Sequence, residues 1–165
     1  TWQRLEVSPT SRASILTGKA LVAFLMQTAQ IAVVLALGAA IFGYRPTGSL
    51  VALAAILLSF SAVLSALGVA LALWSHSRDA ALSLSNIVGM LAAGIGGSFS
   101  TISSFPDWAQ HAARLSPAYW AITAIHEVSL DGAGLADVGT RIGVLWGFFA
   151  VIAGLALVQF RYHRE

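Results

Sequence analysis

Apolar residues dominate four long stretches of the chain, and no Asp, Glu, Lys or Arg interrupts any of them. These uncharged stretches cover residues 20–44, 46–75, 80–106 and 142–160. At a rise of 1.5 Å per residue, about 20 residues of α-helix cross a hydrocarbon core of about 30 Å. The pattern therefore predicts an all-α integral membrane protein with four transmembrane helices, at residues 20–44, 48–75, 80–100 and 142–160.

The polar segment 101–141, between the last two predicted spans, contains two helix starts. Phe105-Pro106-Asp107-Trp108 and Ser116-Pro117 each place a proline where the first turn of a helix tolerates it. We expect short helices at 106–115 and 117–130, which form a re-entrant or interfacial hairpin on the outer side. Aromatic rings suit the headgroup level, so the candidate residues of this hairpin are Pro106, Trp108, Pro117, Tyr119 and Trp120. Two helices lying on the membrane surface are the alternative.

Composition excludes an ordinary soluble domain. The chain has 165 residues, of which 58% are hydrophobic and 10% charged, whereas soluble domains carry about 25% charge. A formal net charge of +2 makes nucleic acid an unsuitable partner. The absence of cysteine excludes disulfides, thiolate metal sites and a cysteine nucleophile.

The distribution of Lys and Arg predicts the orientation, because cytoplasmic segments retain the excess of basic residues. Six of the nine fall in segments 1–19, 76–79 and 161–165, and the other three are spread over the connections on the opposite side. We therefore expect the segment 1–19, the loop 76–79 and the tail 161–165 to be cytoplasmic, in a multi-pass protein of the cell membrane.

The predicted spans carry only neutral polar residues in their interiors, which argues against proton coupling. Gln27 and Gln30 are three residues apart and share a helix face, and Asn86 lies in the third span. These three residues are candidates for a polar substrate pathway or a helix interface. Hydrogen bonding between neighbouring helices is the simpler explanation.

No catalytic or nucleotide site is evident in the sequence. Gly18-Lys19 is followed by Ala20, and Ala13 stands where a phosphate-binding loop needs its first glycine. Intramembrane proteolysis would need a base beside Ser98, but His126 falls in a predicted extramembrane segment and lacks a second histidine at zinc-binding spacing. We expect no enzyme activity and no metal site, so uphill transport would need ATP hydrolysis by another polypeptide.

The first seven residues alternate between apolar and polar types, with Trp2, Leu5 and Val7 interleaved with Gln3, Arg4 and Glu6. This segment suits docking of a soluble partner. A helix on the membrane surface is the alternative.

Three groups of residues together resemble type-2 ABC exporter permeases. Thr1-Trp2-Gln3-Arg4-Leu5, Ser8-Pro9 and Leu16-Thr17-Gly18-Lys19 resemble the loop before the third helix of that family. Gly96-Gly97-Ser98-Phe99, the Pro106 motif and Leu115-Ser116-Pro117-Ala118-Tyr119-Trp120 resemble the segment between its fifth and sixth helices. The resemblance covers essentially the whole chain in order.

The resemblance implies a permease subunit of an ATP-binding cassette transporter, represented here by its last four helices. The chain opens on Thr1, so we expect a fragment that lacks two upstream helices. A coupling segment for an ABC ATPase subunit would include Trp2, Arg4, Leu5, Glu6, Ser8 and Pro9. No cofactor would be bound directly, since ATP and Mg would sit on the partner subunit.

The implied assembly is a homodimer, or two like halves, in the lipid bilayer. It would export a hydrophobic or amphipathic substrate such as a drug, a lipid-linked compound or a peptide. A non-transporting membrane scaffold or regulatory subunit is the alternative.

Overall fold

The computed structural model describes residues 12–43, 46–98 and 104–162, and every regular element among them is helical. Six helices follow one another along the chain: α1 (Arg12–Phe42), α2 (Leu50–Trp74), α3 (Arg78–Ile95), α4 (Asp107–Ala113), α5 (Pro117–Leu130) and α6 (Gly139–Tyr162). The all-α class predicted from the sequence is confirmed for this part of the chain.

Local sequence signals explain where the central helices begin and end. Ser49 caps α2 by accepting a hydrogen bond from Ala52 N at 3.3 Å, and Ser77 caps α3 by accepting one from Ala80 N at 3.1 Å. The chain leaves α3 through Gly96 and Gly97, and Gly97 has a φ of 90°, which side-chain-bearing residues rarely adopt. Helix α3 therefore stops at Ile95, short of the residue 100 expected from hydropathy.

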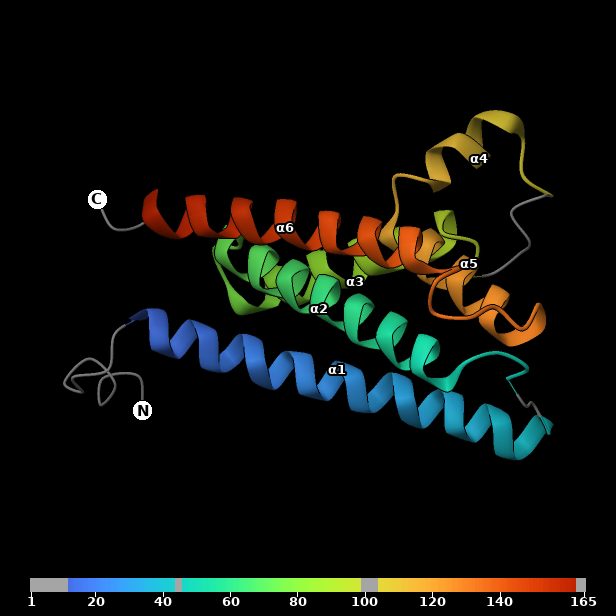
Figure 1. Ribbon diagram of the computed structural model, residues 1–165. Helices are drawn as coiled ribbons and strands as arrows, with labels where there is room; N and C mark the ends of the chain where they lie inside the picture. Colours follow the sequence, from blue (N-terminus) through green and yellow to red (C-terminus); the bar gives the residue numbers. More distant parts are fainter. Residues whose placement is uncertain (1–11, 44–45, 99–103, 163–165) are drawn as a thin grey trace.

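Helix α2 lies at the centre of the bundle and packs against α1, α3, α5 and α6 (Figure 1). One buried cluster joins Ala52 and Ile56 of α2 to Ala124 and Val128 of α5 and to Val138. A second joins Val63 of α2, Ala121 of α5 and Leu145 of α6. Many of the α2 residues at these contacts are small, which lets neighbouring helices approach closely.

Three helices are long and apolar enough to cross a membrane, namely Thr17–Phe42, Leu50–Trp74 and Gly139–Phe160. They correspond to the first, second and fourth predicted spans. Helix α3 is not among them, because Arg78, Asp79 and Asn86 lower the mean hydropathy of its 18 residues. The expected count of four spans is therefore not confirmed, and a span formed by α3 stays a prediction.

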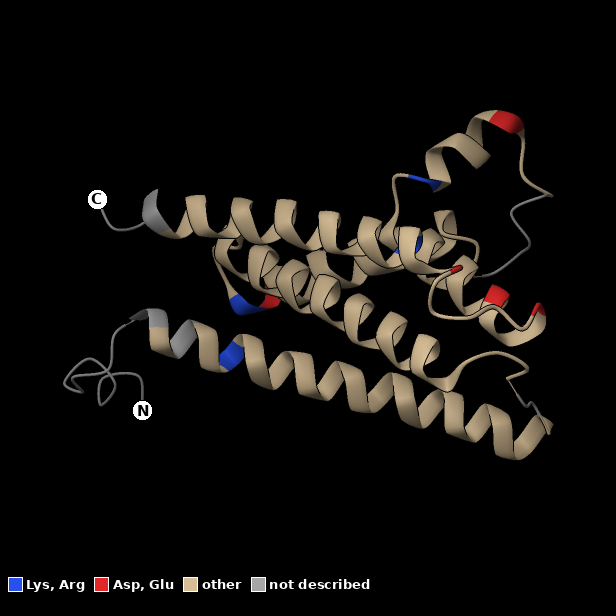
Figure 2. Ribbon diagram, in the orientation of Figure 1, with Lys and Arg blue, Asp and Glu red and all other residues tan. Residues whose placement is uncertain are grey.

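Charged residues of the described chain lie toward the two ends of the bundle, and the middle of the long helices carries none (Figure 2). The first residues of α1, the connection from α2 to α3 and the last turns of α6 lie at one end, called here the terminal end (Figure 1). Residues 46–49, the last turn of α5 and the connection 131–138 lie at the other, called here the capped end. This separation is the one expected of helices that cross an apolar layer.

Candidate functional site

The capped end is closed by backbone hydrogen bonds between the start of α2 and the end of α5. Thr47 N donates to Ser129 O at 3.3 Å, Gly48 N to Val128 O at 2.9 Å and Ser49 N to Ala133 O at 3.3 Å. A Cβ at position 48 would lie 2.5 Å from both Val128 O and Ala133 O. Glycine is therefore required at position 48 for the two segments to come this close.

An ion pair links α5 to α6 next to this closure. Arg141 Nη2 donates to Glu127 Oε1, and the two side chains are 26% and 24% exposed. Partial burial shields the pair from solvent, so it is worth more than an exposed surface pair. The hydrogen bonds and the ion pair together hold α2, α5 and α6 in one body at the capped end.

The start of α5 is fastened to the end of α3. Ser116 Oγ donates to Ala92 O at 2.9 Å, although Ser116 occupies the position from which a side chain would usually cap its own helix. Gly96 packs against the same place, where an added Cβ would come within 2.7 Å of Ala118 Cβ. Helix α5 therefore starts beside the last turns of α3, not at the tip of the bundle.

A bend that contains Arg114 and Ser116 joins α4 to α5, and these two helices occupy the segment predicted as a hairpin. Helix α5 covers about 21 Å, whereas α2 covers about 37 Å. Its residues pack against Ala52 and Ile56 near the start of α2, and Ala121 shares a buried cluster with Val63 near the middle of α2. The bend therefore lies well below the capped end, on the side of the bundle where α5 fills the space between α2 and α6.

The hairpin residues named from the sequence have different environments. Pro106 precedes α4 and Pro117 is the first residue of α5. Trp108 is 75% exposed. Tyr119 and Trp120 are half-buried, their rings meet edge to face at 5.3 Å, and Trp120 Nε1 donates to Arg114 O at 2.8 Å.

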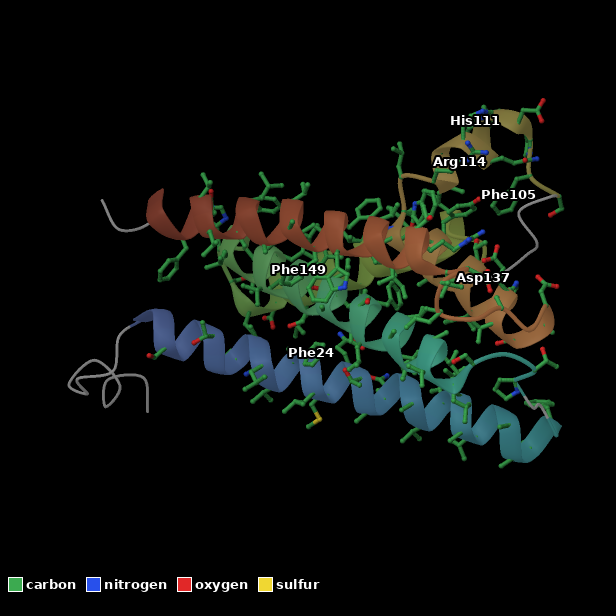
Figure 3. All side chains as sticks on the ribbon, viewed as in Figure 1. Phe24, Phe105, His111, Arg114, Asp137 and Phe149 are labelled. Carbon is green, nitrogen blue, oxygen red and sulfur yellow. The ribbon has the colours of Figure 1, made fainter. Side chains whose placement is uncertain are left out.

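Two aromatic residues of the long helices face α2 in Figure 3, Phe24 from α1 and Phe149 from α6, whereas His111 and Arg114 lie out on the hairpin. Helices α4 and α5 lie between α3 and α6 in the expected chain order. Their packing as a hairpin and its entry into a membrane stay predictions.

A groove of about 470 Å³ separates part of α1 from α2, and Gln27 lines it. Lys19 lies at one end of this groove, and Ser65 and Gly68 form part of the α2 side. Ser65 Oγ donates to Ala20 O at 2.8 Å, which joins the two helices beside the groove. We call this feature the α1–α2 groove.

The structure does not bring the three predicted pathway residues together. Gln27 is half-buried in the α1–α2 groove, Gln30 is exposed on α1, and Asn86 is exposed on α3. Spacing alone placed Gln27 and Gln30 on one face, but the face of α1 that contacts α2 is too narrow to include both. Their role in a pathway remains untested.

The predicted coupling residues Trp2, Arg4, Leu5, Glu6, Ser8 and Pro9 lie outside the described residues. Within the described ranges, no group of His, Asp or Glu side chains is arranged to hold a metal ion.

Sequence reasoning missed Gly48, Ser116 and the pair of Glu127 with Arg141 as organising residues. Each acts through a partner between 14 and 85 positions away, and no local pattern identifies such a partner. The one available signal was Ser49 following a glycine, which is typical of a helix start after a tight connection.

Helices able to cross a membrane, with charges confined to the ends of the bundle, define a multi-pass membrane protein. The family model described as ABC-2 family transporter protein matches residues 1–158. The chain therefore belongs to the ABC-2 transporter family and is an ABC-2 permease, as the sequence resemblance indicated. Neither a curated protein nor a solved structure matches it.

Proposed function

We propose that this chain is the permease subunit of an ABC exporter for a hydrophobic or amphipathic substrate, such as a drug, a lipid-linked compound or a peptide. The observation that carries the proposal is the match to the ABC-2 family over residues 1–158. The chain would have no catalytic site of its own, and ATP and Mg would be bound by a partner ATPase subunit. This division fits the absence of a phosphate-binding loop around Gly18 and Lys19 in the sequence.

The segment before α1 is the proposed coupling surface. It precedes Arg12, the first residue of α1, and α1 starts at the terminal end, the same end at which α6 finishes. That end is cytoplasmic in the proposed orientation, so an ATPase would meet Trp2, Arg4, Leu5, Glu6, Ser8 and Pro9 there. Displacement of this segment would act directly on α1, a continuous helix of 31 residues.

Helix α1 is well placed to move relative to the rest of the permease. It packs on α2, and none of its apolar window is buried within this chain, whereas α2, α5 and α6 are joined at the capped end. Rigid-body tilting of a helix against a fixed body is a common form of conformational switching. The hairpin of α4 and α5 would then enter the outer leaflet and close the outer end of the permease.

A second permease half would complete the pathway, with Gln27, Gln30 and Asn86 as candidate polar contacts for the substrate. Replacement of Gln27 and Gln30 by Leu should lower export while leaving ATPase binding intact. Unchanged export by this double variant would remove both residues from the pathway.

Co-purification with an ATPase tests the central claim. The protein is expressed with tagged ABC ATPases that are encoded by neighbouring genes. The complex is solubilised in mild detergent and analysed for bound subunits and total mass. We expect two permease chains with two ATPases, and loss of the ATPase in the variant Arg4→Glu with Glu6→Lys. Gln3→Ala, next to Arg4 in the same segment, is the matched control and should retain it.

The alternative function is a non-transporting scaffold or regulatory subunit. Such a protein would share the helices but would need no ATPase. A folded preparation that binds no ATPase, or in which the charge-reversed variant binds as well as the unaltered protein, would favour this alternative over the permease.

A further inference from the structure

The α1–α2 groove combines a cation at the membrane boundary with an apolar channel that runs inward. Lys19 is the third residue of the candidate span Thr17–Phe42, and Gln27 lies about 12 Å further along α1. Between them the α2 side is lined mainly by apolar or small residues, including Leu64, Gly68, Val69 and Leu73. Lys19 thus supplies a cation at the boundary end, and the lining beyond it is mostly apolar or small, with Ser65 and Gln27 as its polar members.

The groove opens beside apolar side chains. Leu21, Val22, Leu25 and Met26 of α1 are between 56% and 69% exposed, as expected of a helix surface that faces lipid. A second hollow of about 500 Å³ lies on the other flank of Lys19 and includes Ser14, Gly18 and Val22. Lys19 is exposed and lines both hollows.

We propose that the α1–α2 groove binds an anionic phospholipid, with one acyl chain along α2 and its phosphate beside Lys19. The order of groups in the groove is that of the lipid, with negative charge at the boundary and hydrocarbon below it. Net negative charge on the lipid complements the single cation at the mouth.

The ligand would arrive sideways from the bilayer and would stay bound between α1 and α2. The hydrogen bond from Ser65 Oγ to Ala20 O joins these two helices beside the groove. An acyl chain in the groove would fill the space beside this bond and support the contact of α1 with α2. The inference requires that the chain lies in a membrane, and it does not require that the chain exports anything.

Retention of lipid on the purified full-length chain tests the proposal. The protein is reconstituted in vesicles of phosphatidylcholine with a minor fraction of phosphatidylglycerol, extracted gently, and examined by native mass spectrometry. We expect one retained phosphatidylglycerol per chain in preference to phosphatidylcholine. Lys19→Gln should lower this retention about fivefold, the factor that one basic side chain contributes at an anionic lipid surface.

Gly68→Leu is the steric arm of the test. Nothing lies within 4 Å of a Cβ built at Gly68, so the new side chain enters the groove without displacing its neighbours. It should abolish retention even though Lys19 is still present. Gly147→Leu on α6, where a Cβ also meets open space, and Arg78→Gln, an exposed cation at the same end of the bundle, are the matched controls and should bind as the unaltered protein does.

Three results would overturn the proposal. Equal retention of phosphatidylcholine would remove the role of charge, and retention unaffected by Gly68→Leu would place the lipid elsewhere. A change of oligomeric state in Gly68→Leu with lipid retention unchanged would mean that a helix of a second copy occupies the groove. None of these readouts depends on an ATPase, so the lipid site and the proposed transport function are tested independently.

Discussion

At the scale of single residues, close approach of backbone segments decides which positions tolerate no change. Gly48 donates its N–H to Val128 O at 2.9 Å and leaves no room for a Cβ. At glycines of α6 such as Gly147, by contrast, an added Cβ would meet open space. Two residues of one type thus have opposite importance, and only their spatial neighbours distinguish them.

Gly48→Ala should therefore destabilise the protein by about 1–3 kcal/mol, because the methyl group forces Val128 O and Ala133 O apart. The free energy of unfolding is measured by titration with a denaturing detergent in mixed micelles. The control Gly147→Ala should be neutral or stabilising by about 0.5–1 kcal/mol, since alanine favours helix over glycine. Equal stability of the two variants would show that the closure at residues 46–49 contributes nothing.

At the scale of elements, the packing of α5 and α6 on α2 organises the bundle. Leu145 of α6 is fully buried in the cluster with Val63 and Ala121, and Phe148 and Phe149 pack against the same cluster. Helix α1, by contrast, contributes no residue to either buried cluster. The elements therefore differ in how firmly they are held.

Leu145→Ala should cost about 2–5 kcal/mol, because it leaves a cavity between three helices that have little room to collapse. Leu157→Ala, on the same helix but 60% exposed, removes the same atoms from the lipid-facing surface and should cost far less. The free energy of unfolding of both variants is measured by the same detergent titration as for Gly48→Ala. A similar loss in the two variants would contradict the buried contact of α6 with α2 and α5.

The sequence predicted the elements better than their packing. Uncharged stretches located α2 and α6 closely, because a membrane requires long apolar helices and excludes charge. Hydropathy overestimated the third stretch, where the backbone freedom of Gly97 ends the helix, and it gave no sign of the contacts of Ser116 or Gly48. Of the candidate pathway residues, Gln27 lines the α1–α2 groove, whereas Gln30, which spacing put on the same helix face, lies outside it.

At the scale of the whole molecule, the two ends of the bundle differ in charge. Glu127, Asp131 and Asp137 lie toward the capped end with Arg141, whereas Lys19, Arg78 and Asp79 lie at the terminal end (Figure 2). Asp107 and Arg114 flank α4, away from both. Because cytoplasmic segments retain the excess of basic residues, we expect the terminal end to face inward. This orientation agrees with an ATPase partner at the segment before α1.

Single cysteines test the orientation cleanly, because the chain has no cysteine of its own. Gly132→Cys, in the exposed connection after α5, should react with a membrane-impermeant maleimide in intact cells. Arg164→Cys should react only after permeabilisation, and Ser61→Cys, at a fully buried position, should react in neither case. Labelling of position 164 in intact cells would reverse the proposed topology and with it the location of the coupling segment.

The sequence by itself determined that this protein is helical, lies in a membrane and belongs among the ABC-2 permeases. Those conclusions depend on helix length, on the exclusion of charge from hydrocarbon and on an ordered set of motifs, all of which are local along the chain. The tertiary structure alone decided that α2 is central, that α5 is fastened to α3 and α2 and that a groove runs from Lys19 to Gln27. Such features depend on pairs of residues far apart in sequence, whose proximity is set by packing of whole helices and carries no signature at either position alone.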